Sequence, residues 1–120
     1  MHREPAHAER LHLMLPPDHH APAAARRALR TLTLGVREVD ALLLVSELVG
    51  SAVAHHAGAP IELSATCAPH HARVEVHDHG HGLTAGGLAA GYGFQMLTAA
   101  SERWGLEYDG TTRAWFELDQ

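Results

Sequence analysis

The stretch LLLVSELVGSAVAHHAG, residues 42–58, carries the clearest structural pattern of the chain. Apolar side chains recur in it at the three- and four-residue spacing of a helix that buries one face. The pattern predicts a helix over residues 38 to about 57, and Gly58 ends it because glycine readily adopts the backbone conformation that follows a helix. The predicted buried face consists of Leu42, Val45, Leu48, Val49, Ala52 and Val53.

A carboxylate and a hydroxyl share one side of this otherwise apolar helix. Glu47 and Ser51 are four residues apart, so both project from one side, and His55 continues that line a turn later. A buried charge without a partner is costly, so these residues are candidates for a functional site. The plainer alternatives are a carboxylate bonded to water and a serine bonded to its own helix.

A second polar group stands at the end of a predicted strand in VEVHDHGHG, residues 74–82. A strand end can place a carboxylate at the floor of a pocket, where Asp78 could accept a hydrogen bond from an amino group such as that of adenine. Gly80 and Gly82 would let the backbone pass close to a flat ring. The alternative is that Asp78 only forms a turn.

The third segment, GYGFQML at residues 91–97, places glycines directly before a predicted helix over residues 94 to about 102. Free amides and the helix dipole attract anions to such a helix start. All 9 Lys+Arg residues are arginine, so backbone amides are natural phosphate contacts in this lysine-free chain. The binding candidates here are Gly91, Tyr92, Gly93 and Phe94.

The remaining pattern predicts an α/β protein. A further helix is expected from a cap at Asp18 to about residue 34, and residues 80–93 show no periodicity. We expect a flexible N-terminus over residues 1–8 and a single domain over residues 9–120. The expected strands are residues 11–15, 61–67, 73–78, 104–108 and 112–118.

The composition excludes several classes of function. The formal net charge of the 120 residues is -5, without the clustered basic face that nucleic acid requires. The longest apolar run, residues 41–45, is too short to span a bilayer, and no apolar segment of a secretory signal follows the first residue. Cys67 is the single cysteine, so no intrachain disulfide forms. We expect a cytoplasmic protein that binds neither nucleic acid nor membrane.

In this order, the segments resemble the motifs of the GHKL (histidine-kinase-like) ATP-binding domains, which have the Bergerat fold. Residues 42–58 resemble the N-box, and residues 74–82 and 91–97 resemble the two glycine boxes. GTTRAWFEL, residues 110–118, resembles the closing strand of the anti-sigma-factor serine kinase branch. The resemblance implies a two-layer α/β sandwich with a mixed, mostly antiparallel sheet and helices on one face.

The resemblance also implies how ATP is bound. Asp78 matches the aspartate that reads adenine, and Gly80 and Gly82 line the adenine pocket. Thr111 or its neighbour Thr112 would lie beside that aspartate, and Thr111 is the candidate taken. Residues 91–94 match the phosphate loop.

The catalytic match is less complete. Glu47 corresponds to the general base, and His55 lies a turn beyond the motif as a further binding candidate. Ser51 stands where the family usually has the asparagine that coordinates Mg²⁺, and a hydroxyl is a shorter ligand. Residues 83–90 form only a short lid. The resemblance therefore leaves open a serine/threonine protein kinase and a nucleotide-binding or purely protein-binding switch without catalysis.

The implied partners are a sigma factor and a small antagonist protein that carries the phosphorylated serine, in partner-switching control of transcription. A homodimer stays open. A different hypothesis is a histidine-based metal protein, because His77, His79 and His81 alternate along an extended segment. The other histidines considered for that site are His55, His56, His70 and His71.

Overall fold

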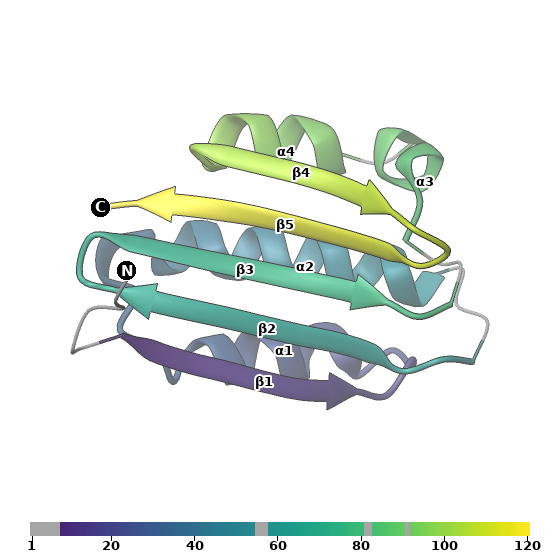
Figure 1. The fold of residues 1–120 in the computed structure, drawn as a ribbon, viewed down its shortest axis with the longest axis horizontal. Coiled ribbons are helices and arrows are strands. Elements are labelled where there is room, and N and C mark those ends of the chain that lie inside the picture. Colours follow the sequence, from purple (N-terminus) through teal and green to yellow (C-terminus); the bar gives the residue numbers. More distant parts are fainter. Residues whose placement is uncertain (1–7, 55–57, 81–82, 91) are drawn as a thin grey trace.

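The computed structural model describes residues 8–54, 58–80, 83–90 and 92–120, which form one five-stranded sheet and its helices. The strand order is β1-β2-β3-β5-β4, and every pairing of neighbouring strands in this order is antiparallel (Figure 1). The sheet therefore contains no parallel pair among these strands, although a mixed sheet was expected. The strands are β1 Glu9–Leu15, β2 Ile61–Ala68, β3 His71–Asp78, β4 Arg103–Tyr108 and β5 Thr112–Asp119.

The helices cover one face of this sheet and leave the other face open (Figure 1). The two-layer α/β sandwich expected from the sequence is thereby confirmed. In the described part of the chain, no helix combines the length and apolar character that crossing a membrane requires. The helices are α1 Ala21–Leu29, the 3-10 turn η1 Gly35–Arg37, α2 Glu38–Ala54, α3 Ala85–Ala90 and α4 Gly93–Ala100.

The central strands alternate strictly between buried and half-buried residues, as expected for a sheet covered on one side. On β5, Phe116 and Leu118 are fully buried against the helices, whereas Trp115 and Glu117 lie on the open face. The same alternation sends Asp78 inward and His77 outward. Neighbouring residues of one strand thus belong to different surfaces.

The first helix is shorter than predicted. Asp18 does not cap it; its carboxylate instead accepts a hydrogen bond from the His20 amide at 2.9 Å, and α1 begins at Ala21. After Leu29 the chain leaves the helix, and Leu32 and Leu34 are both buried while the residues between and beside them are exposed. A series of tight turns buries both leucines, and the Leu34 amide donates to the Leu32 carbonyl at 3.0 Å.

A short helix, α3, lies in the segment for which the sequence showed no pattern. The Thr84 hydroxyl accepts a hydrogen bond from the Gly87 amide at 2.9 Å, which is the usual cap of a helix start. Leu88 anchors the helix because its side chain is 1% exposed. The sequence pattern did not predict this helix because it contains two adjacent glycines, Gly86 and Gly87, which have low helix propensity.

Candidate functional site

The three motif-bearing segments meet at one end of the molecule. There β3 ends at Asp78, β5 begins at Thr112, α3 follows, and α4 begins at Gly93 (Figure 1, right). The long helix α2 contacts β3, α3 and α4, so it forms one wall of this end. The arrangement agrees with a site between α2 and the glycine-rich segments.

Asp78 is a buried carboxylate that holds the loop after its strand. It is 1% exposed, and its two oxygens accept hydrogen bonds from the amides of Gly80 at 2.8 Å and Leu83 at 2.6 Å. A carboxylate offers about four lone-pair positions, so it can accept a further hydrogen bond from a ligand. Gly80 is also buried, whereas Gly82 lies outside the described residues.

Thr112, rather than Thr111, lies beside Asp78. The two strands pair with Asp78 opposite Thr112, which is 6% exposed and faces the helix layer. The Thr111 hydroxyl instead lies 2.7 Å from His77 Nε2 on the open face. The sequence held a signal for this difference, because Thr112 shares the two-residue period of the apolar residues Ala114 and Phe116.

Glu47 and Ser51 are both half-buried on α2. Glu47 forms no side-chain hydrogen bond or ion pair with the described part of the chain. Ser51 is covered by α3, because a methyl group added to Gly87 would lie 3.5 Å from its hydroxyl oxygen. His55, expected to continue this line, lies outside the described residues.

Helix α3 packs closely against the start of α4. A Cβ atom on Gly93 would lie 2.6 Å from the Leu88 side chain, so only glycine fits at this contact. Of the neighbouring candidates, Tyr92 is 70% exposed, Phe94 stacks on Trp104 with ring centroids 5.3 Å apart, and Gly91 lies outside the described residues.

A second group of polar side chains lies on the open face. The Glu62 carboxylate is 2.6 Å from His12 Nε2, 3.0 Å from His79 Nε2 and 3.4 Å from His77 Nδ1. Hydrogen bonds from His12 and then His79 lower the pKa of Glu62 to about 2. Of the other histidines considered for a metal, His71 pairs with Asp119 at the far end of β3.

The remaining four histidines of the metal hypothesis lie elsewhere or are not described. His70 is exposed in the turn between β2 and β3. His55, His56 and His81 lie outside the described residues.

Comparison with known proteins shows similarity in structure. No protein-family model matches the chain, and no curated protein matches it in sequence. Among solved structures, the chain is similar to the crystal structure of the RsbU and RsbW domains of Rv1364c from Mycobacterium tuberculosis, with a TM-score of 0.69 and 22% sequence identity. The match covers 92% of this chain and 32% of that chain, so this chain spans about a third of its length. The fold of this chain is therefore one that a solved structure with RsbU and RsbW domains also contains.

Proposed function

We propose that this chain is an ATP-binding regulatory module that acts by binding protein partners. The observation that carries the proposal is that β3 ends at the buried Asp78 at the same end of the sheet as α3 and the start of α4, and that α2, the helix of Glu47 and Ser51, contacts β3, α3 and α4. The likeness of fold to a structure containing an RsbW domain and the order of the sequence motifs support it.

The residues present fit a nucleotide in part. Asp78 has free lone pairs for the adenine amino group, and Thr112 opposite it supplies a second polar group in an otherwise apolar wall. The amides at the start of α4 suit a phosphate. The Leu88 side chain packs closely against Gly93, so α3 borders the proposed phosphate position.

The proposed activity is transfer of a phosphoryl group to a serine of a partner protein. ATP, when bound, supplies that group, and Glu47 would take the proton of the attacking hydroxyl. A sigma factor and an antagonist protein are the partners that the sequence resemblance suggests. A cytoplasmic location also stays a prediction.

Calorimetric titration with ATP and ADP, with and without Mg²⁺, tests nucleotide binding. We expect the wild type to bind, and Asp78→Asn to lose at least about tenfold in affinity because a hydrogen bond to a charged group is removed. Asp18→Asn is the matched control, since this exposed carboxylate accepts a hydrogen bond from the His20 amide between β1 and α1 and is not one of the residues proposed to bind nucleotide. No binding by a folded wild type would end the proposal.

A switch without catalysis is the second candidate, and the position of α3 beside Ser51 favours it, since a Cβ atom added at Gly87 would lie 3.5 Å from the serine oxygen. The serine hydroxyl is short, and α3 covers it, so Mg²⁺ has a weaker ligand than an asparagine would supply. Ser51→Asn should raise the Mg²⁺-dependent part of ATP affinity. Phosphate transfer to a verified partner that disappears in Glu47→Ala would instead establish the kinase.

A further inference from the structure

We propose that Glu62, His77 and His79 bind a divalent transition-metal ion, with zinc as the expected ion, on the open face of the sheet. This site faces away from the helix layer and does not depend on nucleotide binding. It also differs from a Mg²⁺ site at Ser51, because its donors are imidazole nitrogens and one carboxylate, a set that suits zinc.

The strand register brings the three side chains together. Glu62 on β2 lies directly opposite His77 on β3, and both point to the open face. His79 follows His77 by two residues, and the two rings lie 4.1 Å apart between centroids. The site is thus assembled by antiparallel pairing of two neighbouring strands and the first residues after one of them.

The donor atoms of Glu62 lie close enough to those of both histidines to share a metal ion. One ligand atom from each residue lies within 4.8 Å of the others. The Glu62 oxygen is 3.0 Å from His79 Nε2 and 3.4 Å from His77 Nδ1. Tetrahedral zinc with bonds of 2.0–2.1 Å separates its ligand atoms by about 3.3 Å, so both contacts need only small adjustments.

Surrounding hydrogen bonds orient two of the ligands. A carboxylate only accepts, so the Thr111 hydroxyl donates to Asp109 at 3.2 Å, and its oxygen accepts from His77 Nε2 at 2.7 Å. With the proton on Nε2, the lone pair of Nδ1 is free to bind a metal ion, and Nδ1 lies 3.4 Å from the Glu62 carboxylate. Such a partner on the second nitrogen is the usual support of a metal-binding histidine.

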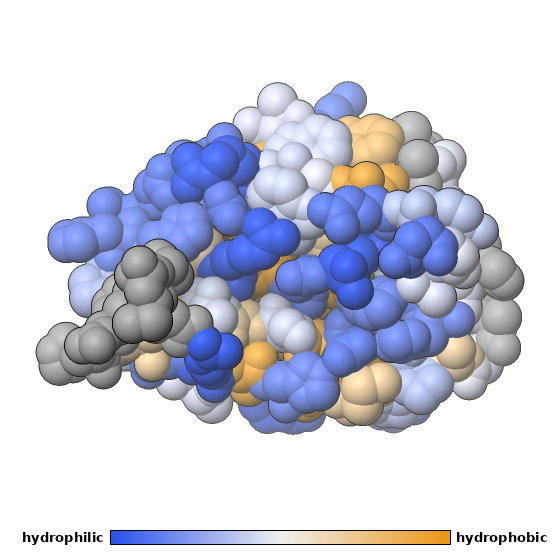
Figure 2. Space-filling view, in the orientation of Figure 1, coloured by the Kyte–Doolittle hydropathy of each residue, from blue (hydrophilic) through white to orange (hydrophobic). Residues whose placement is uncertain are grey.

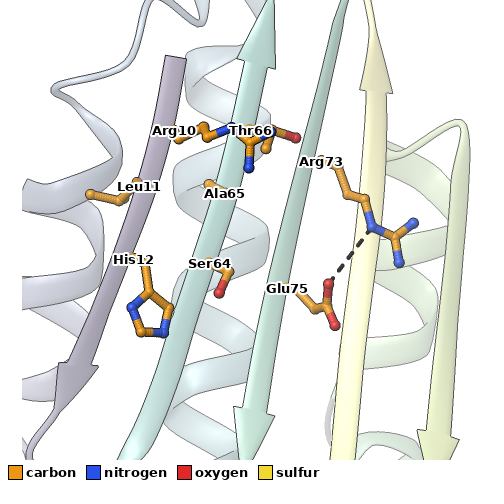
Figure 3. A pocket seen from close by; sticks show the side chains of 8 residues that line it. All are labelled: Arg10, Leu11, His12, Ser64, Ala65, Thr66, Arg73 and Glu75. Carbon is orange, nitrogen blue, oxygen red and sulfur yellow. Dashed lines mark ion pairs between the residues drawn. The ribbon is translucent and has the colours of Figure 1, made fainter. Parts of the chain in front are cut away.

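The Glu62 carboxylate is held from the other side. His12 Nε2 on β1 contacts its second oxygen at 2.6 Å, which fixes the plane of the carboxylate. The side chains of Glu62, His77 and His79 are 27%, 17% and 39% exposed, so an ion can enter and a coordination position stays open to water. His12 also borders a groove of about 430 Å³ between β1 and β3 (Figure 3).

The test uses the full chain purified without a histidine tag and stripped with a chelator. Calorimetric titration with Zn²⁺, and absorption spectroscopy with Co²⁺, are carried out without nucleotide. We expect one ion per chain at this site. Glu62→Gln and His79→Gln should each lower the affinity at least about tenfold, and Thr111→Val should lower it less, because it removes only an orienting bond.

His71→Gln is the matched control, because this histidine lies on the same strand and face but pairs with Asp119. It should leave the affinity unchanged. Thermal unfolding of each variant in chelator confirms that it is folded. The proposal is overturned if His79→Gln and Glu62→Gln bind Zn²⁺ as tightly as the wild type, if His71→Gln weakens binding equally, or if the wild type binds no Zn²⁺.

Discussion

The two faces of the sheet differ in chemistry although they are built from alternate residues of the same strands. On the helix-covered face, Asp78 and Thr112 are the only polar or charged side chains buried among the described residues. On the open face, hydrophilic residues dominate and apolar ones are scattered (Figure 2). One step along β3, from Asp78 to His77, therefore separates the proposed nucleotide site from the proposed metal site.

The faces also differ in what stabilises them. Phe116 is fully buried against the helices, whereas its neighbour Trp115 lies under the Arg73 guanidinium, which is 4.2 Å from the ring. Arg73 also donates to Glu117 at 2.9 Å. Burial of apolar side chains stabilises the helix-covered face. Ion pairs between strands and stacking of Arg73 on Trp115 stabilise the open face.

The largest effect is expected for Phe116→Ala, compared with Trp115→Ala. Loss of the buried phenyl ring should lower the free energy of unfolding by about 3–5 kcal/mol, because it leaves a cavity. Loss of the half-buried indole should cost only about 1–2 kcal/mol. Urea denaturation of both variants measures the difference, and equal losses would contradict the contrast between the faces.

Gly105→Ala should have the next largest effect. A Cβ atom at this position would lie 2.6 Å from Trp115 Nε1, so the substitution should cost about 1–3 kcal/mol of unfolding free energy by overpacking. In the Trp115→Ala background the clash is gone, and alanine should stabilise the strand by about 0.5–1 kcal/mol. A double-mutant cycle without coupling would show that the indole does not lie over this glycine.

The smallest effect concerns pH. Burial raises the pKa of Glu117, but hydrogen bonds from Arg103 and Arg73 outweigh it and lower the pKa below its ordinary value of 4.5. A lowered pKa means that the carboxylate stabilises the fold above pH 4.5 and that this stability is lost as pH falls through the folded-state pKa. Glu117→Gln should therefore cost about 1 kcal/mol at pH 7 and progressively less toward pH 2.

Glu107→Gln is the control for this titration, since its side chain is 61% exposed and 3.9 Å from Arg113. Its unfolding free energy should differ little from that of the wild type at any pH. If Glu117→Gln keeps the same deficit from pH 7 to pH 2, the ion pairs of the open face do not contribute as described.

Periodicity predicted most of the fold. The helix around Glu47 and the strand ending at Asp78 were found because burial of one face leaves a regular apolar repeat in sequence. A polar residue that breaks such a repeat stands out, and for this reason the sequence alone indicated Glu47, Ser51 and Asp78 as candidate site residues. The helix α3 was missed because its stability comes from Thr84 and Leu88 rather than from a repeat.

The sequence predicted less well which residues lie together in each of the two sites. Which of Thr111 and Thr112 faces Asp78 depends on the register of β3 with β5, and that register was not deduced. The histidine hypothesis included His77 and His79 but not Glu62, which is distant in sequence and reaches them only through pairing of β2 with β3. Contacts across strands carry no local signal, so only the fold reveals them.

The most direct test of the account separates the two faces at the end of β3 by measuring ATP and Zn²⁺ affinity in Asp78→Asn and His79→Gln. The account predicts that Asp78→Asn loses ATP affinity and keeps Zn²⁺ affinity, and that His79→Gln does the reverse, with both variants folded. It would be contradicted if folded Asp78→Asn bound ATP like the wild type, or if each substitution weakened both ligands equally.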